Sequence, residues 1–107
     1  MYVVKVTQFR LIKSLNHART LTIEMPLNFI PQIGSFFQSY PWVDGKVREV
    51  WHEADPHRCT HKVYLHEDTS GIYPSFDWDA LPDNVKAGPI FVPHPDGGFT
   101  LPENLNQ

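Results

Sequence analysis

The sequence has very little cysteine and no long apolar run. Cys59 is the only cysteine among 107 residues, so an internal disulfide is excluded, and with it the disulfide framework of many small secreted proteins. No stretch of about 18 apolar residues occurs, which a membrane-spanning helix would need. Lys5 and Arg10 interrupt the apolar N-terminal stretch that a signal peptide would require. We therefore expect a soluble, cytoplasmic protein that does not enter a membrane.

The common signatures of catalysis and of nucleic-acid binding are also absent. The sequence holds no glycine-rich phosphate loop, no G-x-S-x-G and no H-E-x-x-H. The net charge is −3 and the isoelectric point is near 6.0, whereas a nucleic-acid module usually carries a basic excess. Charge is uneven along the chain, +4 over residues 1–20 and −6 from Glu67 onward. These two regions could attract each other within one molecule or between two.

What the sequence does have is a hydrophobic period of two, which is typical of β-strands. The chain has the size of one domain, 1–107, which we divide into a β-barrel core over 1–67 and a proline-rich, acidic covering tail over 68–107. Ten prolines favour short strands joined by rigid turns. We predict a mostly β fold, namely a small, partly open antiparallel barrel of the SH3-like or OB-like kind. Its C-terminal tail is expected to be irregular, with at most a short helix. A two-sheet sandwich is the alternative.

The individual strands follow from alternation and turn residues. Alternation over Tyr2 to Val6 changes phase at Phe9, which indicates either a bulge near residues 7–8 or a strand buried on both faces. Residues 19–25 alternate cleanly and should pair with this first strand. Asp44-Gly45 predicts a tight turn before a strand over 46–53, and residues 60–66 should return as its hairpin partner.

The tail breaks the alternation. Residues 77–88 could hold a helical turn or two, because Pro82 suits a first helical position and Gly88 a C-terminal cap. Residues 89–102 predict two short extended arms around a Pro-Asp-Gly-Gly turn, with Pro93 restricting the first arm to a sheet edge.

Two spaced motifs support the barrel. The orders Pro31-x-x-Gly34-x-Phe36 and Gly45-x-Val47-x-x-Val50-x-His52 resemble a pattern in short bacterial and phage SH3-like β-barrel proteins, many of them uncharacterised. The resemblance covers roughly residues 19–66 and consists of turn and core residues. It implies a fold and assigns no catalytic residue.

Chemically capable side chains gather in the hairpin over residues 46–67. In an extended strand His57, Cys59 and His61 would share a face, and His52 could lie across the ladder near Cys59. Imidazole and thiolate suit a zinc ion, so these four residues are the candidate metal ligands and zinc is the candidate cofactor. The alternative is that the histidines lie on the surface and Cys59 is a small buried residue, with no cofactor bound. Cys59 as a nucleophile is a further alternative.

Aromatic side chains gather before residue 44 and give a second candidate site. In a small barrel most aromatics belong to the core, but a loop this short has little room to bury Tyr40, Pro41 and Trp42 together. With Phe37 they are the candidate binding residues, and such residues can form a shallow groove for a peptide or a stacking surface for bases.

We therefore predict a non-enzymatic binding module, such as a small accessory or inhibitor protein of bacterial or phage origin, that contacts another protein through these loop aromatics. A metal- or thiol-dependent enzyme using the His and Cys hairpin is one alternative. The other is a structural subunit that self-associates as a homodimer through exposed edges, such as the arm over residues 90–92.

Overall fold

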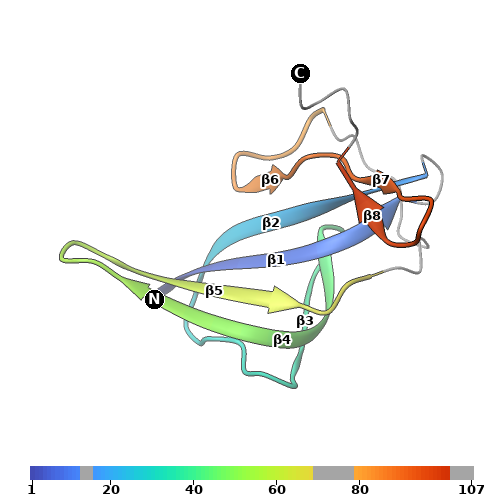
Figure 1. Cartoon of the computed structure of the whole chain (residues 1–107). Helices are drawn as coiled ribbons and strands as arrows, with labels where there is room; N and C mark the ends of the chain where they lie inside the picture. Colours follow the sequence, from blue (N-terminus) through green and yellow to red (C-terminus); the bar gives the residue numbers. More distant parts are fainter. Residues whose placement is uncertain (13–15, 69–78, 102–107) are drawn as a thin grey trace.

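The computed structural model describes residues 1–12, 16–68 and 79–101, and within these residues the chain forms strands and no helix (Figure 1). The strands are β1 (Tyr2–Ile12), β2 (His17–Leu27), β3 (Phe36–Ser39), β4 (Val43–Ala54), β5 (Cys59–Leu65), β6 (Val85–Ala87), β7 (Val92–Pro93) and β8 (Phe99–Thr100). The described part of the chain contains no helix long and apolar enough to cross a membrane.

Strands β1 to β6 form one curled sheet in the order β3-β4-β5-β1-β2-β6, and β7 and β8 form a separate two-stranded sheet. All neighbouring strands of the large sheet are antiparallel except β1 and β5, which are parallel. A bulge between Val47 and Glu49 lets β4 bend, so that β3 and the first part of β4 turn across the sheet (Figure 1). The predicted mostly β, partly open barrel is confirmed.

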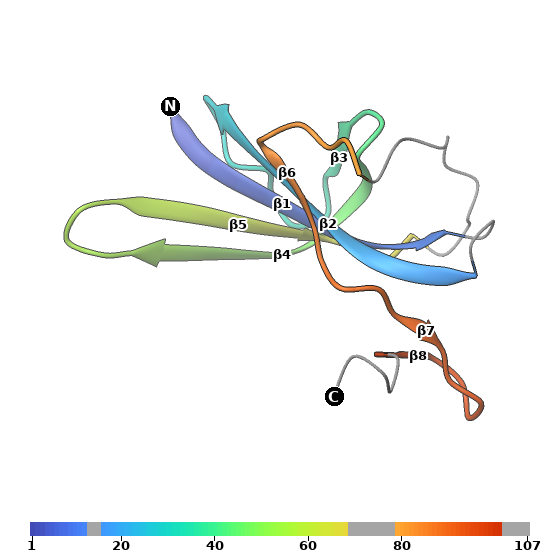
Figure 2. The same ribbon diagram turned by 90° about the horizontal axis from the view of Figure 1, so that it is seen from above.

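The core fills the inner, concave face of this half-barrel. Side chains from five strands are almost completely buried there: Val4, Val6, Leu21, Ile23, Val43, Val47, Val63, Leu65 and Val85. Along each strand these residues alternate with residues that face outward, and this alternation is the pattern from which the strands were predicted. The tip of the β4–β5 hairpin extends beyond this core, and every residue from Trp51 to Cys59 is exposed (Figure 2).

The first hairpin forms as predicted, but without a bulge at residues 7–8. The β1–β2 register runs without interruption from Tyr2↔Leu27 to Ile12↔His17. The change of phase follows the other predicted alternative, because the end of β1 is covered on both faces. Phe9, on the outer face, packs edge-on against Phe91 and Phe99 at ring distances of 5.8 Å each.

The inner face at this end of β1 carries two buried polar side chains, Gln8 and Arg10. The Gln8 side chain bonds the backbone of Asp44 twice, donating from Nε2 to the carbonyl at 2.7 Å and accepting from the amide at 2.9 Å. Arg10 donates to the carbonyls of Pro41 and Trp42 at 3.2 and 2.6 Å. At this end of the barrel, side-chain hydrogen bonds therefore join β1 to residues 41–44, where a closed barrel would have backbone hydrogen bonds between strands.

The prediction of a tight turn at Asp44-Gly45 is wrong, because both residues lie inside β4 and pair with β3. The chain instead turns at residues 40–42, where the amide of Trp42 donates to the carbonyl of Ser39 at 2.8 Å. Glycine is needed at position 45 for another reason. A Cβ there would lie 2.9 Å from Nε2 of Gln8, closer than normal packing allows.

The described part of the tail forms strands where a helical turn was predicted. Val85 is buried in the core, and β6 pairs with β2 through Ile23↔Val85 and its neighbours. Burying Val85 against the sheet outweighs the weak local signal of Pro82 and Gly88 for a helix. Residues 77–78 of that predicted helix lie outside the described residues, as do residues 69–76 and 102–107 of the tail.

The last described segment matches its prediction. β7 and β8 pair through Val92↔Thr100 and Pro93↔Phe99 around the Pro-Asp-Gly-Gly turn.

The expected attraction between the basic and acidic regions also occurs within the molecule. The buried Arg10 guanidinium lies 3.0 Å from the Asp68 carboxylate, which accepts a hydrogen bond from it.

Candidate functional site

The loop aromatics predicted as binding residues divide into exposed and packed side chains. Tyr40 is 68% exposed. Phe37 and Trp42 are half-buried and pack against the core cluster. Pro41 is half-buried, and its carbonyl is one of the two that Arg10 binds. Of the four predicted residues, only Tyr40 presents a large aromatic surface to solvent.

A residue outside that predicted set, Phe36, is a second exposed aromatic in this segment. Phe36 is 81% exposed at the start of β3, and Tyr40 lies in the turn directly after this strand. Gln38, two residues after Phe36 and on the same face of β3, is exposed as well. The signal in the sequence was the alternation itself, because Phe37 can face the core only if Phe36 faces outward.

β3 is also an edge of the sheet. Among the described strands its only neighbour is β4, where Phe36 lies opposite Lys46 and Gln38 opposite Asp44. The far side of β3 therefore offers unpaired backbone groups of the kind that a strand from another chain can bind. Exposed aromatics and a free strand edge coincide on this segment.

The arm over residues 90–92, predicted as a free edge for self-association, is paired on one side. The backbone amide and carbonyl of Phe91 both bond Ala18, at 2.7 and 2.8 Å, and Val92 pairs with Thr100.

The second candidate site lies at the opposite, open end of the half-barrel, in the β4–β5 hairpin. His52 and His61 are directly opposite one another in the ladder, and their Nδ1 atoms are 2.7 Å apart. One Nδ1 must carry a proton and donate it to the other. His61 is 8% exposed and packs against Tyr2 in a T-shaped contact with ring centroids 5.2 Å apart, whereas His52 is exposed. One ring is therefore fixed by packing and the other is accessible.

The remaining predicted ligands stand further out on the hairpin. Cys59 is exposed, not buried, and its Sγ lies 3.8 Å from Nε2 of His61. Cys59 pairs with Ala54 in the ladder, and the residue directly across from His52 is His61. His57 is in the turn, where its amide donates to the Asp55 carboxylate at 2.7 Å.

This turn is shaped by the carboxylate of Asp55. Hydrogen bonds from the backbone amides of His57 and then Arg58 hold the pKa of Asp55 below its ordinary value. His57 therefore lies in the turn and not on the ladder that carries the imidazole pair. Among the described residues, no three histidine, cysteine or acidic side chains are gathered closely enough to hold a metal ion.

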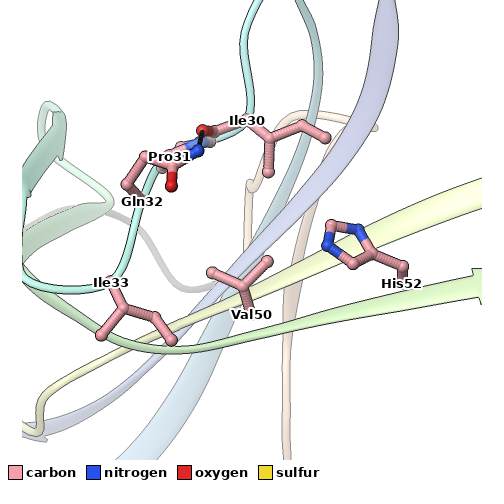
Figure 3. A pocket seen from close by; sticks show the side chains of 6 residues that line it. All are labelled: Ile30, Pro31, Gln32, Ile33, Val50 and His52. Atoms are coloured by element: carbon pink, nitrogen blue, oxygen red, sulfur yellow. Dashed lines mark hydrogen bonds between the residues drawn. The ribbon is translucent and has the colours of Figure 1, made fainter.

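A cleft of about 430 Å³ with a mixed polar and apolar lining reaches one member of the imidazole pair, His52. Its lining comes from the β2–β3 connection and from β4, namely Ile30, Pro31, Gln32, Ile33, Val50 and His52. Figure 3 shows the side chains of Ile33 and Val50 facing one another, with His52 further along β4 on the same side. Ile33 is 67% exposed, so the cleft is open to solvent.

The outer face of the sheet carries a shallow polar groove of about 350 Å³ lined by Lys5, Thr7, Thr22, Lys62 and Tyr64. Its charge is partly compensated, because Nζ of Lys62 lies 3.0 Å from Oε1 of Glu53. That hydrogen bond and the charge of Glu53 raise the pKa of Lys62. One of the two lysines that line the groove is thus paired with an acidic side chain.

Comparison with known proteins gives no match. No family model, no curated protein and no solved structure is significantly similar to this chain. Function must therefore be argued from the geometry of the two candidate sites.

Proposed function

We propose that the protein is a binding module that contacts another protein through strand β3. The observation that carries this proposal is the coincidence of a free sheet edge with two strongly exposed aromatic side chains, Phe36 on β3 and Tyr40 in the turn directly after it. A partner segment that pairs with the edge would gain backbone hydrogen bonds, and the aromatics would add specificity on the outer face. Aromatic side chains are the most frequent source of binding energy at protein interfaces.

The charge distribution favours a protein over a nucleic acid as the partner. The residues opposite Phe36 and Gln38 are Lys46 and Asp44, so the outer face of this hairpin carries both signs of charge. The whole protein has a net charge of −3, which repels a phosphate backbone. Phe37 and Trp42, which belong to the predicted binding set, support the surface from beneath by packing on the core.

Site-specific photo-cross-linking tests the proposal. A photoreactive phenylalanine analogue is placed at position 36 or 40 and, as a control, at position 51, where Trp51 is 55% exposed on β4. In a lysate of the source cells, positions 36 and 40 should give the same cross-linked protein and position 51 should not. With the analogue at position 38 instead, where Gln38 is exposed between the two aromatics, the double variant Phe36→Ser, Tyr40→Ser should lose the adduct that the same probe gives when both aromatics are present.

Two results would contradict this function. Equal adducts from position 51 would show that the contact is not at β3, and an unchanged adduct in the double variant would show that the aromatics contribute nothing. A cross-link only between two copies of the chain would favour the self-associating subunit instead, with β3 as its edge.

A further inference from the structure

The open end of the half-barrel holds an arrangement that the β3 proposal does not use. His52 and His61 are cross-strand partners whose Nδ1 atoms lie 2.7 Å apart, so two imidazole nitrogens are aimed at one point. In the metal-free pair a single proton occupies that point. A metal ion that accepts imidazole can take its place, once the proton of the donor ring has moved from Nδ1 to Nε2.

The distances fit such an exchange. Imidazole nitrogens bind divalent transition ions at about 2.0–2.1 Å, so two of them are about 2.9 Å apart at right angles and about 3.3 Å apart in a tetrahedron. The observed 2.7 Å therefore has to widen by only a few tenths of an ångström for a square-planar ion, and by about 0.6 Å for a tetrahedral one. Rotation of the exposed His52 ring suffices for either change.

We propose that Nδ1 of His52 and Nδ1 of His61 form a binding site for a divalent transition-metal ion of the copper, nickel and zinc group. The site has two protein ligands, which agrees with the lack of any cluster of three ligands among the described residues. Water fills the other coordination positions. Preference within the group follows the general order for imidazole ligands, with copper tightest.

The surroundings of His61 prepare it as a ligand. Its Nε2 lies 3.8 Å from Sγ of Cys59, so in the metal-binding tautomer the Nε2 proton is directed to the sulfur. A hydrogen bond from the second ring nitrogen commonly fixes the tautomer and orientation of a ligating histidine. The Tyr2 ring packs against the imidazole from another side, with the two ring centroids 5.2 Å apart. Cys59 is thus an orienting residue beside the site and not a ligand.

The position of the site gives the ion access to other molecules. His52 lines the cleft together with Val50 and Ile33, so the open coordination positions lie next to that cleft. The charged pair of Glu53 and Lys62 belongs to alternate positions of the same strands and therefore faces the other side of the sheet. A bound molecule with a carboxylate or imidazole near an apolar group could contact both the ion and the cleft.

Titration with Zn²⁺ and Ni²⁺ tests the proposal, since neither ion oxidises Cys59. The tag-free protein at pH 7.5 should bind one ion in calorimetry and in native mass spectrometry. His52→Asn should weaken binding at least about tenfold, because a ligand is lost. His57→Asn is the matched control, since His57 lies on the same hairpin and outside the pair, and it should change affinity less than about twofold.

Two further measurements keep the test independent of folding. Cys59→Ser should weaken binding several-fold without abolishing it, and the ring signals of His52 and His61 should shift together in NMR spectra of the unchanged protein. Absence of binding at millimolar Zn²⁺ would overturn the proposal, as would His52→Asn binding like the unchanged protein or His57→Asn losing the ion. None of these results bears on β3, so the two proposals are tested separately.

Discussion

Replacing Gln8 by methionine tests how the half-barrel is closed. Gln8 is 1% exposed, and its side chain bonds three backbone groups of distant segments. Two of these bonds go to Asp44 in β4, and the third runs from Nε2 to the carbonyl of His66 at 3.0 Å. Methionine has a similar length and volume and keeps the packing, but it cannot form these bonds.

The expected loss of stability follows from the groups left behind. Gln8→Met leaves one amide and two carbonyls without their partner in a partly buried position. An unsatisfied buried group costs about 1–3 kcal/mol, and the lower figure applies here because the bonds are only partly buried. We expect the free energy of unfolding to fall by about 3 kcal/mol, a large part of what a domain of this size has.

Denaturant unfolding followed by tryptophan fluorescence measures this change, because Trp42 lies in the segment that Gln8 holds. Gln38→Met is the matched control, since it makes the same substitution at an exposed position in β3, and it should change stability by less than about 0.5 kcal/mol. If Gln8→Met costs less than about 1 kcal/mol, or no more than the control, the Gln8 bonds do not close the barrel.

Two other predictions follow from the burial of particular side chains. Trp42→Ala should lower the free energy of unfolding by about 2 kcal/mol because Trp42 packs on the core, while Tyr40→Ala should change it little, and thermal unfolding compares the two. Burial and the charge of Arg19 lower the pKa of His17 below its ordinary value of 6.5, and its buried Nε2 has no hydrogen-bond partner among the described residues. The unfolded chain therefore takes up the proton more readily, so this contribution to stability is present above about pH 6.5 and is lost progressively as the pH falls from there through the lower pKa of the folded state. Unfolding at pH 7.5 and 5.5 should show a smaller loss in His17→Gln than in the unchanged protein, and equal losses would contradict the assignment.

The strands were predictable because alternation is a local property of the sequence. The period of two in β1, β2 and β5 reflects one face on the core and one outside, and no other segment needs to be known to see it. Sequence also located the β4–β5 hairpin and the β7–β8 hairpin. In each case the turn residues and the alternation agree.

The errors occur where a distant residue decides the structure. Asp44-Gly45 has the composition of a tight turn, but glycine is required there because Gln8, 37 positions earlier, packs against its backbone. The local preference for a helix at Pro82 and Gly88 is outweighed by pairing with β2, because residues 85–87 form the sixth strand of the large sheet. Neither partner can be recognised from the local sequence.

The candidate sites were predicted in part for the same reason. The cluster of aromatics was visible, but exposure of Phe36 rather than Phe37 depends on the register of β3 against β4. For the hairpin, the sequence placed His52 across the ladder near Cys59, but it did not identify His61 as the direct partner of His52. A shift of register by two residues keeps the face and changes the neighbours, and periodicity alone cannot fix it.

The two ends of the inner face differ in a way that explains where binding is expected. Between them the inward positions of β1 and β5 are apolar, with Val4, Val6 and Val63 in the middle. At one end the inward polar residue is Gln8, whose bonding groups are used by the backbone of β4. At the other end the inward polar residue is His61, and its partner is another side chain that solvent can reach. The first end therefore stabilises the fold, whereas the second keeps bonding capacity that an external ion or molecule can use.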